Sequence, residues 1–159
     1  MPTTLNWVLA HEPYHVFIKA ARNFAQEVAE ETRGEYQINV IDLTEWNQRA
    51  KDNLTTLTTD RERIINLVGN GSIDLATVYA NTLGTLDQDM YALSMPFLFR
   101  DHEHAAKVFE GPIGESLLEG YSRRSNIQGM AFTYSGGFRN VLSSKKVSTL
   151  KGLTDEDQN

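Results

Sequence analysis

Short apolar runs alternate with longer amphipathic segments along most of this chain, and the alternation limits the folds open to it. Residues 5–10 are apolar and aromatic, which predicts a buried strand. Residues 17–28 repeat apolar side chains at spacings of three and four, which predicts an amphipathic helix. Residues 36–43 and residues 73–80 predict two further strands. Strands that alternate with helices favour an α/β sandwich with a largely parallel sheet.

The remaining segments are predicted from shorter signals. Thr59 and Glu62 fit a capping box, so we expect a helix to begin there and to end at the next glycines. Asp101 is expected to cap another helix, which Gly111 and Pro112 interrupt. We further expect a loop over residues 46–58, a loop over residues 81–88, a fourth strand over residues 127–134 and a fifth over residues 141–143.

The composition excludes several classes of protein. The 159-residue chain has no cysteine and carries 21 acidic against 15 basic residues, a net charge of −6. The absence of cysteine excludes disulfide scaffolds, iron–sulfur clusters and thiol catalysis. The negative charge argues against binding to the phosphate backbone of nucleic acid. No run approaches the ~20 apolar residues that span a bilayer, and the first residues lack the basic and apolar regions of a signal peptide.

Polar and aromatic residues follow three of the predicted strands at their carboxyl ends, where open α/β sheets bind ligands. His11 and Glu12 follow the first strand, and Tyr79 and Asn81 follow the third. Tyr134 stands at the end of the fourth. The sequence therefore predicts a binding site at this edge of the sheet.

His11, Glu12 and His15 also fit the H-E-x-x-H signature of zinc proteases, which offers an alternative function as a small metallohydrolase. That chemistry needs both imidazoles on one face of a continuous helix, with the glutamate as general base. Pro13 lies inside the motif, however, and the preceding residues predict a strand. A helix running unbroken through residues 9–20 would favour the enzyme, and a strand-to-helix junction at Pro13 would favour a binding protein.

Arg139 follows Gly136 and Gly137, just past the fourth predicted strand. A glycine pair lets the backbone approach a ligand closely, and a guanidinium group binds a carboxylate through two parallel hydrogen bonds. The alternative interpretation is that Arg139 is an ordinary surface arginine whose side chain covers the sheet. Its spacing alone leaves both interpretations open.

Six motifs are spread over residues 5–153: LAHEP at 9–13, GSID at 71–74, MPFLFRDHEHA at 95–105, FEGPIG at 109–114, GFRN at 137–140 and LKGL at 150–153. Each motif is weak alone. In combination they resemble the solute-binding proteins of TRAP-type (tripartite ATP-independent periplasmic) transporters, the DctP-like family.

The resemblance implies a receptor without cofactor or catalytic activity, which captures a small organic acid in the periplasm. It would deliver the acid to the membrane subunits of a sodium-coupled permease and would not itself span the membrane. The implied fold is a type II periplasmic-binding-protein lobe with a mixed, mostly parallel sheet. The implied ligand is a dicarboxylate, a sugar acid or a related carboxylate, gripped by Arg139. The other implied site residues are His11, Glu12, Tyr79, Asn81, Tyr134 and Asp60, the last at the start of a site-lining helix.

The chain departs from the family near its end. Relatives continue after LKGL with a strand that carries a second cleft arginine, whereas here acidic residues follow. The second lobe is also expected to be truncated, so residues 1–132 would form an incomplete first lobe and residues 133–159 would begin the second and end in an acidic tail. Because one lobe leaves the cleft open to water, we expect weak binding of acids or none. The missing second arginine also leaves a ligand-free α/β interaction domain as an alternative.

Overall fold

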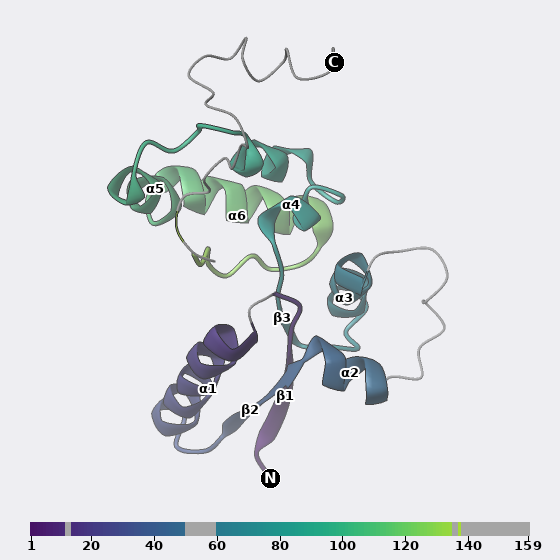
Figure 1. Cartoon of the computed structure of the whole chain (residues 1–159). Helices are drawn as coiled ribbons and strands as arrows, with labels where there is room; N and C mark the ends of the chain where they lie inside the picture. The colour runs from purple at the N-terminus through teal and green to yellow at the C-terminus, as the bar shows by residue number, and fades with distance from the viewer. Residues whose placement is uncertain (12–13, 50–59, 135–136, 138–159) are drawn as a thin grey trace, which may run out of the picture.

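The computed structural model describes residues 1–11, 14–49, 60–134 and 137. Figure 1 shows two parts, one with a sheet and one built from helices. The sheet part comprises β1 (Thr3–Leu9), α1 (Tyr14–Glu31), β2 (Tyr36–Asp42), α2 (Leu43–Arg49), α3 (Asp60–Gly69) and β3 (Leu75–Thr77). The helical part comprises α4 (Ala80–Leu83), the 3-10 helix η1 (Gln88–Ser94), α5 (His102–Phe109) and α6 (Pro112–Ser125).

The three described strands form a parallel sheet in the order β2-β1-β3. Thr3 to Leu9 pair in register with Tyr36 to Asp42, and Leu9 also pairs with Thr77. The α/β class and the parallel pairing predicted from the alternation are confirmed. All pairings among the described strands are parallel, so the described part of the sheet is not mixed.

One face of the sheet is covered by α1 (Figure 1). Trp7 points to this face, and its ring meets Phe24 edge to face at 5.5 Å between centroids. The predicted amphipathic helix is confirmed, since Ala21 and Phe24 lie on its apolar stripe and Ala21 is buried. The chain reverses after α1 at Gly34, whose φ of 80° is a left-handed conformation that glycine adopts without strain.

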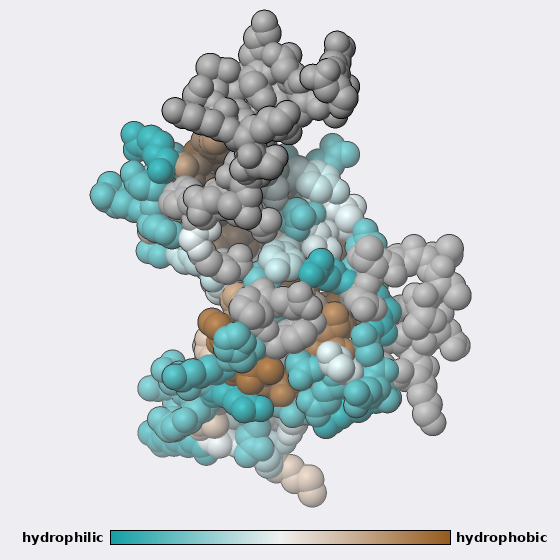
Figure 2. Space-filling view, in the orientation of Figure 1, coloured by the Kyte–Doolittle hydropathy of each residue, from teal (hydrophilic) through white to brown (hydrophobic). Residues whose placement is uncertain are grey.

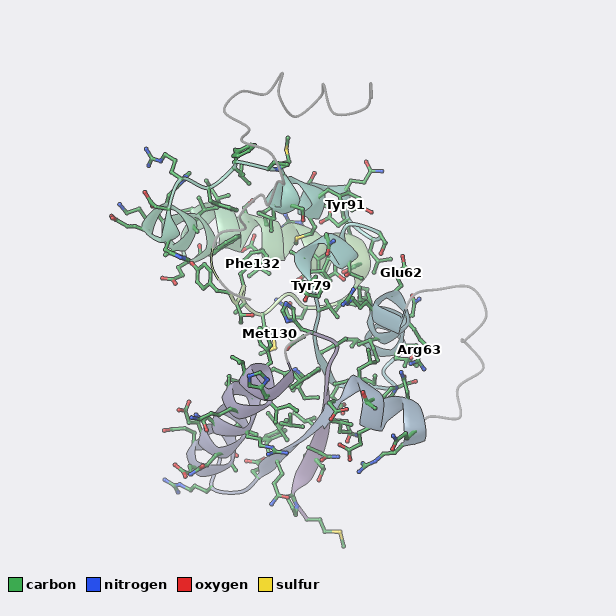
Figure 3. All side chains as sticks on the ribbon, viewed as in Figure 1. Glu62, Arg63, Tyr79, Tyr91, Met130 and Phe132 are labelled. Atoms are coloured by element: carbon green, nitrogen blue, oxygen red, sulfur yellow. The ribbon has the colours of Figure 1, made fainter. Side chains whose placement is uncertain are left out.

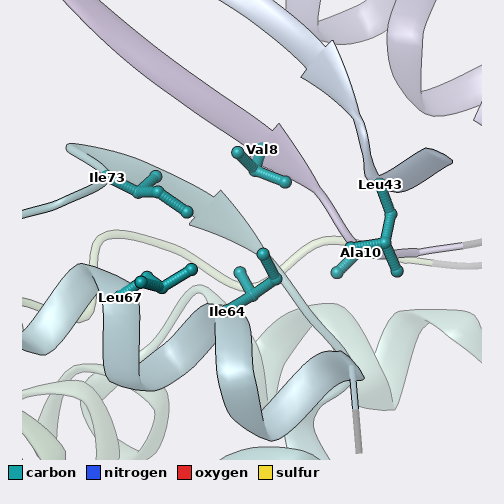
Figure 4. Packing of buried hydrophobic residues seen from close by; sticks show 6 residues of the cluster. All are labelled: Val8, Ala10, Leu43, Ile64, Leu67 and Ile73. Carbon is teal, nitrogen blue, oxygen red and sulfur yellow. The ribbon is translucent and has the colours of Figure 1, made fainter. Parts of the chain in front are cut away.

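The opposite face of the sheet packs on α2 and α3 and holds the main core. Side chains alternate along a strand, so Val8 and Ala10 face away from α1. Figure 4 shows Val8 and Ala10 between the strands and α3, with Leu43, the first residue of α2, in the same cluster. The buried cluster consists of Val8, Ala10, Leu43, Ile64, Leu67 and Ile73.

The predicted loop over residues 46–58 is wrong in its first part, because α2 continues to Arg49. The Asp42 side chain accepts a hydrogen bond from the Glu45 amide at 2.8 Å and so caps the helix. Glu45 and Arg49 form an ion pair one turn apart, and Trp46 packs against the core. A seven-residue helix is too short to show a clear period in the sequence. Residues 50–59, including the Thr59 cap, lie outside the described residues.

The third strand and the loop after it were also predicted wrongly in detail. The strand is confined to Leu75–Thr77, and residues 81–88 include most of α4 and the start of η1. The Asp87 side chain accepts a hydrogen bond from the Asp89 amide at 3.2 Å, which starts η1. Polar residues such as Asn81 and Thr82 resemble a loop in sequence, although here they form a single helical turn.

The predicted fourth strand over residues 127–134 is wrong, because these residues adopt no strand. Their polar groups bind α6 instead. The Ser122 hydroxyl accepts from the Gly129 amide at 3.0 Å, and the Ser125 hydroxyl accepts from the Ile127 amide at 3.2 Å. The Phe132 ring packs on Phe109 of α5 at 5.0 Å. A short apolar run does not distinguish a strand from an irregular segment that packs against a helix in this way. The expected fifth strand, residues 141–143, lies outside the described residues.

The junction of α5 and α6 explains the FEGPIG motif. Asp101 caps α5 as predicted, since its side chain accepts from the His104 amide at 2.7 Å. Pro112 occupies the first turn of α6, where its missing amide proton is not needed. A Cβ on Gly111 would overlap the Lys107 carbonyl oxygen, and one on Gly114 would overlap the Phe109 carbonyl oxygen. Glycine at both positions therefore allows the two helices to meet tightly.

Candidate ligand-binding site

The carboxyl ends of β1 and β3 lie side by side at one edge of the sheet. The last ladder contact joins the Ala10 amide to the Thr77 carbonyl oxygen at 3.0 Å. The Trp7 indole N–H donates to the Thr77 hydroxyl at 3.0 Å and fixes the same pairing from the side chains. His11 and Tyr79 therefore leave the sheet next to each other, as the position rule for parallel sheets predicts.

Four side chains from four segments form a stack at this edge, which we call the ring stack: Phe17, His11, Tyr79 and Arg61. The His11 and Tyr79 ring centroids are 3.8 Å apart with the planes tilted by 39°. The His11 ring also meets the Phe17 ring of α1 edge to face, with centroids 4.2 Å apart and planes at 60°. His11 is only 4% exposed, and its imidazole contacts both aromatic rings.

Arg61 completes the ring stack from the first turn of α3. Its guanidinium carbon lies 4.7 Å from the centroid of the Tyr79 ring, which is the geometry of a cation–π contact. Figure 3 shows Tyr79 where the sheet and helical parts meet. Arg61 was not among the site residues predicted from the sequence. The one feature that could have indicated it is its positive charge in the first turn of a helix, where the helix dipole favours anions.

The other candidate residues are placed as follows. Asn81 is exposed on α4, two residues after Tyr79. Tyr134 is 44% exposed, and its ring meets Phe109 of α5 at 5.9 Å. Asp60 is the first residue of α3. Glu12 and Arg139 lie outside the described residues, so their predicted roles stay predictions.

The helix needed for the zinc-protease motif does not form over His11. Helix α1 begins at Tyr14, whereas Ala10 and His11 have no helical conformation. His15 is exposed and His11 is buried in the ring stack, so the two imidazoles do not share one helix face. Among residues 1–11, 14–49, 60–134 and 137, no three His, Cys, Asp or Glu side chains gather as a metal site would require.

A cluster of perturbed titratable groups lies in the helical part. The Arg124 guanidinium donates to Asp87 at 2.6 Å and to Asp89 at 2.8 Å. The hydrogen bond from Arg124 lowers the pKa of the Asp87 carboxyl, although burial of that side chain opposes the effect. Burial raises the pKa of the Tyr121 phenol in α6. The ion pairs of Arg124 with Asp87 and Asp89 connect the start of η1 to the end of α6.

The surface is indented between the sheet part and the helical part. Figure 2 shows this indentation on one face, with apolar residues gathered along its lower rim. In the described part of the chain, no helix is both long and apolar enough to cross a membrane.

A parallel sheet between helices, with aromatic and polar residues gathered beyond its carboxyl ends, is an α/β arrangement in which that edge is the usual place for a ligand. Residues 9–155 match the DctP family model, bacterial extracellular solute-binding protein, family 7, and the chain belongs to this family. The resemblance inferred from the six motifs is thereby confirmed.

Individual relatives agree with this assignment. The chain is 32% identical over 142 residues to the 2,3-diketo-L-gulonate-binding periplasmic protein YiaO of Escherichia coli, a match that covers 84% of this chain and 38% of YiaO. The chain therefore spans about two fifths of the length of this relative.

Solved structures show the fold directly. A TRAP periplasmic solute-binding protein from Xanthobacter autotrophicus with bound β-D-galacturonate superimposes with a TM-score of 0.64 at 26% identity, over 80% of this chain and 39% of that one. One from Polaromonas bound to D-erythronate gives 0.61 at 27% identity, over 81% and 38%. The predicted type II periplasmic-binding fold is thus confirmed for the part that the chain covers.

Proposed function

We propose that this chain binds a small organic carboxylate as the solute-binding component of a TRAP transporter. The observation that carries the proposal is the contact of His11 with Tyr79 beyond the carboxyl ends of β1 and β3, in a member of the DctP family. Relatives that share this fold bind D-galacturonate and D-erythronate, which are both sugar acids. The proposed ligand class is therefore a sugar acid or a related carboxylate, and the protein acts as a receptor without catalysis.

The proposed site assigns roles to Arg139, Tyr79 and Asn81. Arg139 binds the ligand carboxylate through paired hydrogen bonds, which is the geometry that a guanidinium group favours. Tyr79 supplies a ring contact and Asn81 an amide contact from the edge of the sheet. Asn81 is exposed, so a ligand can reach it. The other proposed contributors are His11, Glu12, Asp60 and Tyr134.

The proposal extends to the whole transport process. The receptor acts in the periplasm, as YiaO does, and delivers its ligand to the membrane subunits of a sodium-coupled permease. Residues 1–132 form the lobe that carries the ring stack, and residues 133–159 begin the lobe that carries Arg139.

Isothermal calorimetry and NMR titration of the 159-residue chain test the proposal. D-Galacturonate and D-erythronate are the probes, and the methyl ester of D-galacturonate is the matched ligand without charge. A cleft without a complete second lobe leaves the ligand exposed to water, which weakens charge pairing, so we expect a dissociation constant of about 1 mM for the acids. The ester is expected to bind at least about tenfold more weakly.

Variants of Arg139 separate its role from that of a surface arginine. Arg139→Met should weaken acid binding about tenfold or more, whereas Arg139→Lys should retain part of it through a single hydrogen bond. Arg22→Met is the control, because it removes the same charge from an exposed position on α1, and it should bind the acids like the wild type. Equal binding of acid and ester, or no binding of either acid, would contradict the proposed function.

A further inference from the structure

Two arginines in the first turn of α3 have different partners. Arg63 is 4% exposed and donates a hydrogen bond to the Asn47 side chain, so it ties α3 to α2. Arg61 is partly exposed and lies over the Tyr79 ring instead. Arg61 therefore points to the edge of the sheet where β1 and β3 end.

If the Arg61 side chain contacted only water, its charge would be disfavoured at this end of the helix. A helix N-terminus carries partial positive charge, which disfavours a cation in the first turn. The face of an aromatic ring carries partial negative charge and attracts a guanidinium group. The Tyr79 ring is in turn in contact with His11, which also contacts Phe17. The contact thus fixes the ring of the residue that links β3 to α4.

We propose that Arg61 is a positioning residue of the carboxylate site, which acts by holding the Tyr79 ring against His11. This inference rests on the proposed function. A tyrosine at the start of α4 has rotational freedom about its side chain, and that freedom is lost when a ligand contacts the ring. Arg61 removes the freedom before the ligand arrives, so less ordering accompanies binding.

The effect should be seen first without ligand. Stacked rings at 3.8 Å shift each other's proton resonances, so the ring protons of His11 and Tyr79 report their contact. Arg61→Met keeps the apolar stem and removes the cation, and it should move both sets of resonances. Arg61→Lys keeps a cation and should restore at least half of the shift. Arg22→Met, with the same loss of charge on α1, should leave them unmoved.

Ligand binding gives the second measurement. Arg61→Met should weaken D-galacturonate binding about 3- to 10-fold, and Arg61→Lys should recover part of the affinity. The loss should disappear in a Tyr79→Leu background, because Arg61 then has no ring to hold. Amide spectra that match the wild type away from the ring stack, together with an unchanged melting temperature, show that each variant is folded.

Each outcome separates this inference from the proposed function. If the wild-type chain binds D-galacturonate and Arg61→Met binds it equally well, the inference alone is wrong. An equal loss in the wild-type and Tyr79→Leu backgrounds also overturns it, because Arg61 would then act without Tyr79. If no acid binds but the ring resonances depend on Arg61, the proposed function fails and the positioning of Tyr79 is supported. Unmoved resonances in Arg61→Met contradict the inference whatever the ligand result.

Discussion

The Asp87 carboxylate links two helices, because it caps η1 and forms an ion pair with Arg124 of α6. Its side chain is 3% exposed and receives hydrogen bonds from the Asp89 amide and from Arg124, whose own side chain is 46% exposed. A buried carboxylate is costly unless such donors accompany it. Asp89 binds the same guanidinium group, but its side chain is 65% exposed, so water screens that pair.

We expect Asp87→Asn to destabilise the protein by about 1–2 kcal/mol near neutral pH, because it removes a charge-assisted hydrogen bond from a buried position. Asp89→Asn should cost less than about 0.5 kcal/mol. Urea unfolding followed by far-UV circular dichroism measures both. A loss at Asp89 as large as that at Asp87 would refute the explanation by burial.

The same pair predicts a pH dependence. The pKa of Asp87 is lowered in the folded state, so its stabilisation is fully present above the unfolded-state pKa of about 3.9 and is lost as pH falls through the lower folded value. Arg124 stays charged throughout, since the hydrogen bond to Asp87 raises its pKa further. The stability difference between wild type and Asp87→Asn should therefore persist down to about pH 4 and shrink below it. A difference that already vanishes at about pH 6 would contradict this assignment.

Phe97 adopts a left-handed backbone with φ of 62° although it is 94% exposed. A large side chain in this region is strained, and glycine is not. Phe97→Gly should therefore raise the free energy of unfolding by about 0.5–1 kcal/mol, after the extra freedom of the unfolded glycine is subtracted. Phe97→Ala keeps the strain and serves as the control. If Phe97→Ala stabilises the protein equally, loss of the exposed ring rather than relief of strain is the cause.

At the scale of elements, the long periodic segments were predictable and the short ones were not. The apolar stripe of α1 and the alternation of β2 extend over enough residues to identify each element. Helices α2 and α4 have seven and four residues, so local caps and tertiary contacts decide them. The segment after α6 contains strand-forming residues, but hydrogen bonds to Ser122 and Ser125 replace strand pairing.

The α5–α6 junction gives a prediction at this scale. Gly114→Ala should destabilise the protein by about 2 kcal/mol or more, because the new Cβ meets the Phe109 carbonyl oxygen and the backbone must move. Gly69→Ala is the matched control at the end of α3, where a Cβ would lie 3.5 Å from Ile127, an ordinary contact. It should be neutral or slightly stabilising, since alanine favours helix. Thermal unfolding compares the two, and similar melting temperatures would rule out the steric explanation.

At the scale of the whole molecule, the site was only partly predictable. The rule for parallel sheets selected His11 and Tyr79, and the structure brings their rings into contact. The rule could not select Arg61. Successive charged residues at the start of a helix do not indicate which of their side chains points to the sheet edge. The predicted strand that would have placed Tyr134 at the same edge is not formed, and the Tyr134 ring meets Phe109 instead.

The two parts should differ in their resistance to local opening. Strand β1 is hydrogen-bonded on both edges and covered on both faces, whereas η1 is a 3-10 helix with several exposed side chains. Amide hydrogen exchange should therefore be slowest at Val8 and Leu9 and at least about 100-fold faster in η1. Equal protection in both would show that the molecule opens as one unit.

Both tryptophans belong to the sheet part: Trp7 lies on its α1 side, and Trp46 packs against the core on the other. Their emission consequently reports on that layer from both directions and gives no direct signal from α5 or α6. A fluorescence melting curve and a dichroism melting curve of this chain need not coincide, and any separation between them measures how strongly the two parts are coupled.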